Sequence, residues 1–317
     1  MEPAQFLTAP RVTIVAGKGG VGKTTTAAAF GIAASRIGLS ALIVEVEGKS
    51  ALAGLFGVGE LTYDEIELIP RGGVHGGLRA RTLTADDALV EHLETHGLRR
   101  ISNRLTSSGA LDMVATATPG IKDVLLLGKI KQLERTAVAD VIIVDAPAAG
   151  HAISFLRSAQ GLLDAVKVGQ IETQAREVHE MLSDPSRSQV VLVTLPEETP
   201  VNELVETAFS LEDQVGVSLG PIVVNGLYPP LRGLGTDPTK AAAAAKAKLL
   251  PGEAAALKLA ATFRTARAAL QDVQVERLGR ELPLPQLRLP FLFTTELTRA
   301  DVEQLADHLV DGIEALS

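Results

Sequence analysis

A glycine-rich segment near the amino-terminal end of the chain has the residue types and spacing of a phosphate-binding loop. Residues 17–25, GKGGVGKTT, fit the pattern GxxxxGK[ST] and follow an apolar segment. Glycines let backbone N–H groups turn inward around phosphate oxygens, and a helix beginning near Lys23 directs the positive end of its dipole to the same anion. We expect Lys23 to reach the β- and γ-phosphates of a nucleotide and Thr24 to bind Mg²⁺. The expected phosphate-binding residues are Gly17, Lys18, Gly19, Gly20, Val21, Gly22, Lys23, Thr24 and Thr25.

Short apolar segments alternate along the chain with longer segments of helical pattern. The short segments are apolar at successive positions, as parallel strands covered by helices on both faces require. This alternation predicts an α/β fold in which helices flank a doubly wound, mostly parallel sheet. The expected strands are Val12–Ala16, Ala41–Val46, Val141–Asp145, Val190–Thr194, Ile222–Asn225 and Gln286–Phe291.

The helical segments predict the domain organisation. An Ala-rich stretch from Lys240 to Gln271 is interrupted by Pro251 and Gly252, so we expect two helices there. We expect residues 1–317 to form a single domain, with a helical subdomain at about 85–136 and in part of 152–185. The other expected helices are Lys23–Ile37, a block from about Ala85 to Thr136, Ile171–Leu182, Val201–Gln214 and residues 299–315.

Composition excludes several classes of protein. The 317 residues carry a net charge of −8 and no long basic run, which disfavours a protein that coats nucleic acid. The absence of cysteine excludes disulfides, thiolate zinc sites and iron–sulfur clusters. The longest apolar run is only the five residues Ala241–Ala245, and no secretory leader is recognisable, so we expect a cytoplasmic protein without a membrane span.

Further motifs follow the loop in a consistent order. Lys18, one residue after the first glycine, produces the deviant form of the loop, and residues 145–151 (DAPAAGH) are similar to a switch of sequence DTAPTGH. Together these motifs resemble those of the ArsA-type ATPases, P-loop NTPases of the SIMIBI class. Residues 47–50 (EGKS) stand where that family has its first switch, DPAH. That family includes arsenical pump ATPases and ATPases that deliver tail-anchored membrane proteins. Further similar segments are 119–121 (PGI), 194–197 (TLPE), 223–225 (VVN) and 289–292 (LPFL).

The resemblance implies ATP hydrolysis with Mg²⁺ and assigns three catalytic residues. Lys18 would reach a partner's nucleotide across a dimer interface, in the role that an arginine finger has elsewhere. Asp145 would hold the Mg²⁺ shell together with Thr24. Glu47 would orient the attacking water or accept its proton. His151 would sense the γ-phosphate, although a buried core histidine is an open alternative. The implied switch residues are Glu47, Gly48, Lys49, Ser50, Gly150 and His151.

The resemblance also implies a site for the adenine base. Asn225 would recognise the N6/N7 edge of adenine, and Pro290 and Phe291 would line the pocket for the base. The alternative for Asn225 is a residue that only forms a turn at the end of a strand. No NKxD sequence, which would recognise guanine, occurs in the chain, and this favours ATP over GTP.

The client that such an ATPase would serve is not specified by the sequence. Without cysteine, the chain has neither the metalloid site of arsenite pumps nor the zinc site that joins targeting dimers. Apolar residues in 124–130 are consistent with core packing or with a client groove. One ATPase unit with Lys18 predicts a homodimer, or a heterodimer with a paralogous ATPase, that acts on an unknown client protein. No nucleic-acid partner and no stable membrane insertion are expected.

Three main functional hypotheses result, beside a minor fourth, a small-molecule ligase that uses the same loop but whose substrate site nothing in the sequence marks. The first is an ATP-hydrolysing dimeric switch that couples nucleotide-dependent opening and closing to a client. The second is a nucleotide-stabilised, weakly hydrolysing interaction subunit of a heterodimer, suggested by the departures at Glu47, Lys49 and Ser50 from the family's first switch. The third is a partitioning-type ATPase. Such proteins use a basic DNA patch or a basic amphipathic helix, whereas the polar face of residues 299–315 is acidic.

Overall fold

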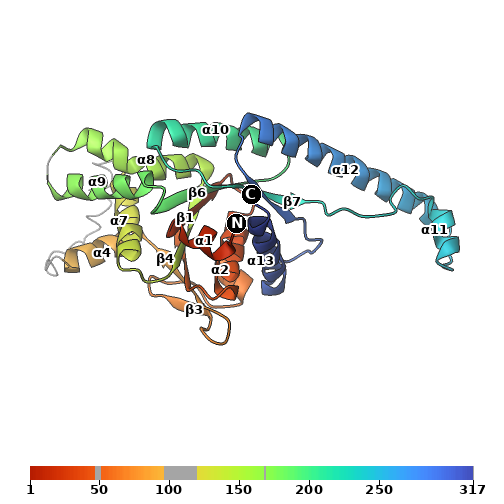
Figure 1. Ribbon diagram of the computed structural model, residues 1–317, viewed down its shortest axis with the longest axis horizontal. Helices are drawn as coiled ribbons and strands as arrows, with labels where there is room; N and C mark the ends of the chain where they lie inside the picture. Colours follow the sequence, from red (N-terminus) through yellow and green to blue (C-terminus); the bar gives the residue numbers. More distant parts are fainter. Residues whose placement is uncertain (47–50, 96–119, 168, 317) are drawn as a thin grey trace.

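A single sheet organises the protein. The computed structural model describes residues 1–46, 51–95, 120–167 and 169–316. Within them, eight strands are arranged in the order β3-β4-β2-β5-β1-β6-β7-β8. Figure 1 shows the helices that surround this sheet. All neighbouring strands are parallel except the antiparallel pair β3 and β4, so the predicted mostly parallel α/β fold is confirmed. The strands are β1 (Val12–Gly17), β2 (Ala41–Val46), β3 (Ile66–Ile69), β4 (Leu78–Leu83), β5 (Val141–Ala148), β6 (Ser188–Thr194), β7 (Ile222–Leu227) and β8 (Gln286–Pro290).

Helices connect and cover these strands. The break in the Ala-rich stretch is confirmed, because α11 and α12 are separate helices and Gly252 is the N-cap of α12. Of the expected block 85–136, the structure describes α4 and α7; residues 96–119 lie outside the described part. The helices are α1 (Pro3–Thr8), α2 (Lys23–Arg36), α3 (Ala51–Phe56), α4 (Ala85–Thr95), α7 (Ile121–Arg135), α8 (Ala149–Ala165), α9 (Gln170–Ser183), α10 (Glu198–Val215), α11 (Pro238–Ala244), α12 (Glu253–Glu281) and α13 (Arg299–Glu314).

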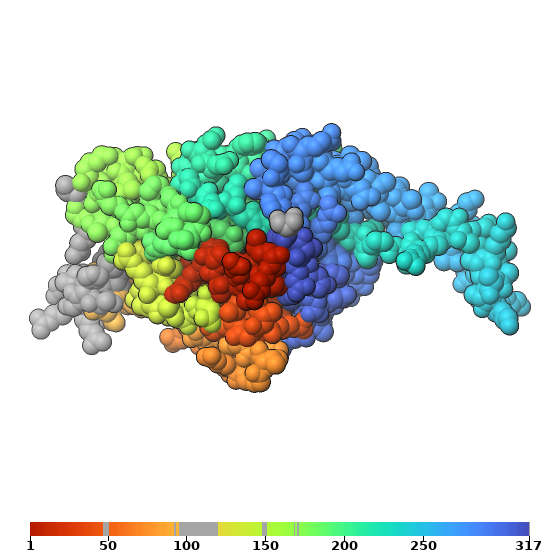
Figure 2. Space-filling model, in the orientation of Figure 1, coloured from red at the N-terminus to blue at the C-terminus, as the bar shows by residue number. Residues whose placement is uncertain are grey.

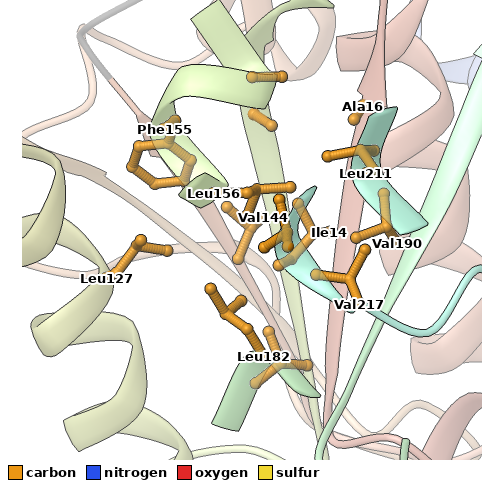
Figure 3. Packing of buried hydrophobic residues seen from close by; sticks show 14 of the residues in the cluster. Ile14, Ala16, Leu127, Val144, Phe155, Leu156, Leu182, Val190, Leu211 and Val217 are labelled. Atoms are coloured by element: carbon orange, nitrogen blue, oxygen red, sulfur yellow. The ribbon is translucent and has the colours of Figure 1, made fainter. Parts of the chain in front are cut away.

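The core lies in two layers, one on each face of the sheet. Side chains alternate across β1: Ile14 belongs to the cluster under α7, α8, α9 and α10, and Val15 to the cluster under α1, α2 and α13. Figure 3 shows the first cluster, in which Leu156 of α8 lies beside Val144 of β5 and Phe155 lies on the side of Leu127 of α7. This packing holds β1, and therefore the loop that follows it, between two covered faces.

Two strands were not expected from the sequence. β3 and β4 form an antiparallel pair, and the glycine-rich residues 72–77 connect them. β4 has the sequence LRARTL, in which two arginines and a threonine interrupt what would otherwise be an apolar run. Arg81 is buried there, with its guanidinium 3.7 Å from the Glu65 carboxylate and 4.4 Å from the centre of the Tyr63 ring. These partners allow a charged residue to occupy a buried strand position.

The apolar side of α7 is part of the core. Val124, Leu126, Leu127 and Ile130 are all buried within the first cluster, which decides their role in favour of core packing rather than a client groove. α13 likewise buries its apolar face, and its acidic face is directed outward. Among the helices that the structure describes, none combines the length and the apolar composition that crossing a bilayer requires.

Candidate nucleotide-binding site

The loop between β1 and α2 has the backbone geometry of a cradle. Gly17 ends β1, and a Cβ atom added to it would lie 2.4 Å from the Val193 carbonyl oxygen of β6. Gly22 is the N-cap of α2 with a left-handed backbone (φ 94°), which favours glycine. The loop therefore turns tightly and presents the amino-terminal end of α2 to its concave side, an arrangement that attracts anions.

Lys23 and Thr24 direct polar atoms to the same place from the first turn of α2. Lys23 is buried, and its Nζ donates a hydrogen bond to the Lys18 carbonyl oxygen across the loop (2.9 Å). The Thr24 hydroxyl donates to Oδ2 of Asp145 (2.6 Å), although the two residues are 121 positions apart in the chain. Asp145 is fully buried and lies on β5, which neighbours β1 in the sheet. The fold thus brings together the two oxygen-bearing residues that were expected to hold Mg²⁺.

Asn225 of β7 contacts the same loop. Its side-chain amide donates to the Val21 carbonyl oxygen (2.9 Å), and a Cβ atom added to Gly22 would lie 2.3 Å from its Nδ2. Asn225 is therefore not merely a turn residue, because it fixes the loop to β7. The remaining amide atom, Oδ1, is an acceptor that suits the N6 amino group of adenine.

Replacing Gly22 with alanine should lower the free energy of unfolding by about 1–2 kcal/mol or more, because φ 94° strains a residue with a Cβ atom and that atom collides with Asn225. Gly19→Ala is the matched control, since nothing lies within 4 Å of its added Cβ atom. Urea denaturation of both variants checks this expectation. Equal stability of the two variants would contradict the described loop geometry.

The predicted base-binding residues lie beside a group of aromatic rings. Pro290 ends β8, and the Phe291 amide donates to the Leu227 carbonyl oxygen of β7 (2.7 Å). The Phe291 ring lies 5.3 Å from the Tyr228 ring and 4.8 Å from the Phe293 ring, measured between centres. The chain has only ten aromatic residues, so three in contact at one strand edge are a concentration that the sequence alone did not reveal.

α12 supports this aromatic group. The Arg264 guanidinium lies 4.8 Å from the centre of the Phe293 ring and 5.4 Å from that of Tyr228. The buried Gln271 accepts a hydrogen bond from the Tyr228 amide (2.8 Å) and donates to the Gly226 carbonyl oxygen (3.0 Å). Sequence reasoning missed both residues, because each acts through a strand far from it in the chain.

Lys18 lies at the outer side of the loop. Its side chain is 46% exposed and forms an ion pair with Glu203 of α10 in the same chain. Glu203 is itself 34% exposed, and ion pairs between exposed groups contribute only about 0–1 kcal/mol. The ammonium of Lys18 is therefore accessible from outside the chain at little energetic cost.

The switch residues are only partly covered by the structure. Glu47, Gly48, Lys49 and Ser50 lie outside the described residues. Gly150 and His151 lie in the first turn of α8, directly after β5. His151 is exposed, so the alternative of a buried core histidine is wrong.

Comparisons with known proteins identify the family. Residues 10–174, slightly more than half of the chain, match the anion-transporting ATPase family. The chain belongs to this family. It is 34% identical over 232 residues to the ATPase BagA of Mycobacterium tuberculosis, an alignment that covers 70% of this chain and 67% of BagA. The predicted membership of the ArsA-type ATPases is thereby confirmed, and the protein is an ATPase.

Two further relatives are less similar to this chain or align with a smaller share of it. A putative arsenical pump-driving ATPase of Halobacterium salinarum is 25% identical over 237 residues, which cover 69% of this chain and 36% of that protein. The ATPase get3 of Schizosaccharomyces japonicus is 30% identical over 142 residues, which cover 45% of this chain and 42% of get3. The family match includes the glycine-rich loop and Asp145, whereas Asn225 and Phe291 lie beyond it.

Proposed function

We propose that this ATPase works as a dimeric switch, which binds ATP with Mg²⁺ in residues 17–25 and couples nucleotide-dependent opening and closing to a client protein. The observation that carries the proposal is the convergence of Lys23, Thr24 and Asp145 beside the glycine cradle. A cation, two oxygen ligands and the amino-terminal end of a helix meet there, as nucleoside triphosphate chemistry requires.

The residues present fit both ATP and Mg²⁺. The loop can take its tight path because Gly17 and Gly22 lack a Cβ atom, which would collide with the Val193 carbonyl oxygen and with the Asn225 side chain. The Thr24 hydroxyl and the Asp145 carboxylate are hard oxygen groups of the kind that Mg²⁺ prefers, and they would hold the ion or its water shell. The bound ion would neutralise charge on the β- and γ-phosphates.

Hydrolysis would use the chain's own residues chiefly for positioning and for electrostatic stabilisation. Water attacks the γ-phosphorus, the bond to the β–γ bridging oxygen breaks, and ADP and phosphate leave. Lys23 would hold the β- and γ-phosphates, and the Lys18 of a second subunit would stabilise charge that develops on the transferred phosphoryl group. Glu47, which lies outside the described residues, would orient the attacking water.

The ion pair of Lys18 supports its action on a partner subunit. In the single chain, the exposed ammonium of Lys18 is paired with Glu203 of α10. A triphosphate bound in a facing subunit would compete with the Glu203 carboxylate for the Lys18 ammonium. The triphosphate carries several negative charges, whereas the carboxylate carries one. Closing the dimer on ATP would exchange a weak ion pair for a stronger contact, and release of phosphate would reverse this exchange.

Replacing Lys18 with alanine should leave the affinity for ATP within about threefold of wild type and reduce turnover at least about tenfold. ATP should also fail to promote dimerisation of this variant. Titration with ATP, a steady-state ATPase assay and light scattering with and without nucleotide measure the three properties. Unaltered turnover would contradict the role of Lys18 on a partner's nucleotide.

A further inference from the structure

Residues 231–270, called the arm below, project from the body of the protein. They comprise the connection to α11, α11 itself and the amino-terminal part of α12 (Figures 1 and 2). The structure describes all of these residues, and none of them is buried. With a rise of about 1.5 Å per residue, the helix from Glu253 to Leu270 extends about 27 Å. The arm therefore has no core of its own to explain its apolar side chains.

Large apolar residues are exposed along the arm. Leu259, Phe263 and Leu270 are 72%, 66% and 61% exposed. Their spacing of four and then seven residues places them on one side of α12. Leu231, Leu250 and Leu257 are exposed as well. Apolar residues gathered on one projecting element indicate a surface that another molecule covers.

The arm is basic although the chain is acidic. Seven basic and two acidic residues give residues 231–270 a net charge of +5, whereas the whole chain carries −8 and the rest of it therefore carries −13. The acidic residues are Asp237 and Glu253. The basic residues are Arg232, Lys240, Lys246, Lys248, Lys258, Arg264 and Arg267.

Most of these cations are available to an outside partner. Arg264 and Arg267 are directed to the body, where Arg264 stacks on aromatic rings and Arg267 forms an ion pair with Glu197. The other five form no ion pair with any residue that the structure describes. The arm thus combines unpaired positive charge with exposed leucine and phenylalanine.

This combination favours an anionic lipid surface over other occupants. Pairing the arms of two copies would bring two charges of +5 together. Nucleic acid would neutralise the lysines but leave Leu259 and Phe263 in water. Anionic headgroups neutralise the lysines while the acyl boundary receives the apolar side chains.

We propose that the arm docks the ATPase on the surface of an anionic membrane, with Lys240, Lys246, Lys248 and Lys258 among the headgroups and Leu259 and Phe263 at the acyl boundary. The length of the arm matters here, because the body carries −13 and would be repelled. Electrostatic interactions in water fade over about 8 Å at physiological ionic strength, which is much less than the reach of the arm. The proposed contact is at the membrane surface, and the arm does not cross the bilayer.

Flotation of the full-length protein with vesicles tests this proposal. The protein should bind vesicles that contain phosphatidylglycerol, not pure phosphatidylcholine vesicles, and binding should decrease as salt rises. Lys246→Glu with Lys248→Glu should weaken partitioning at least about tenfold, since each cation near an anionic surface adds to the binding and each introduced anion opposes it. The control with the same change of charge on the body, Lys167→Glu with Arg280→Glu, should bind as wild type does.

A second pair of variants tests the apolar contribution. Phe263→Ser should weaken binding to the anionic vesicles several-fold, whereas Phe209→Ser, at an exposed phenylalanine of α10, should not. Absence of binding, equal binding to neutral vesicles, or loss in the body variants would overturn the proposal. So would a dimer that forms without vesicles and is lost in Phe263→Ser, which would identify a second copy as the occupant. Lys23→Ala should still bind vesicles, so this result is independent of the nucleotide site.

Discussion

Lys23→Ala should reduce the affinity for ATP at least about a hundredfold. Lys23 is buried at the start of α2 and reaches across the loop to the Lys18 carbonyl oxygen, so its ammonium is fixed where the phosphates are expected. Its loss removes charge-assisted hydrogen bonds to phosphate, each worth about 1.5–3 kcal/mol, and leaves backbone donors without the compensating charge. Isothermal titration with ATP measures the affinity.

Lys18→Ala is the matched control for this loss. The residue lies in the same loop and carries the same charge, but its side chain is exposed and paired with Glu203. The affinity of the Lys18 variant should remain close to that of wild type. Undiminished affinity in Lys23→Ala, with the fold verified by circular dichroism, would contradict the placement of the phosphates.

Asp145→Asn should reduce turnover at least about a hundredfold and abolish the dependence of ATP binding on Mg²⁺. The substitution keeps the size of the side chain but removes the carboxylate that accepts the Thr24 hydrogen bond. Because the phosphates and the carboxylate repel each other, affinity for ATP without Mg²⁺ should not fall. ATPase assays and ATP titrations, each with and without Mg²⁺, measure both effects.

Asp140→Asn, just before the same strand, provides the control. Asp140 directly precedes the amino-terminal end of β5, and it accepts hydrogen bonds from the Ser40 backbone amide (2.9 Å) and hydroxyl (2.6 Å). Its substitution should affect stability and leave turnover unchanged. If Asp145→Asn retained Mg²⁺-dependent turnover, the assignment of Asp145 to the Mg²⁺ shell would be wrong.

The parts of the fold that sequence predicted are those where one physical signal dominates. Runs such as VTIVA and VIIVD can be buried on both faces only as inner parallel strands, and they became β1 and β5. β4 escaped prediction because its buried Arg81 depends on Glu65 and Tyr63, partners that only the folded chain brings near. Local pattern carries no information about such compensation.

In the candidate site, too, the residues with a local sequence pattern were predictable, and the contacts between distant segments were not. The glycine-rich loop was recognisable because its spacing is local, and Thr24 and Asp145 met because strands β1 and β5 are neighbours. The pairing of Lys18 with Glu203, and the support of Tyr228 by Gln271, join distant segments through side-chain geometry. The arm was predicted as two helices, but alanine-rich sequence suits buried and exposed helices equally, so its projection from the body was not predictable.

A mixing experiment tests the central claim most directly, namely that each loop binds its own nucleotide through Lys23 and serves its partner's through Lys18. Lys18→Ala and Lys23→Ala should each be inactive alone. When the two variants are mixed in equal amounts and exchange subunits, about half of the dimers contain one subunit of each variant. Each mixed dimer has one complete site of its two, with Lys23 from one variant and Lys18 from the other. About a quarter of wild-type turnover should therefore return. Turnover that stays at the sum of the two separate variants would contradict the claim.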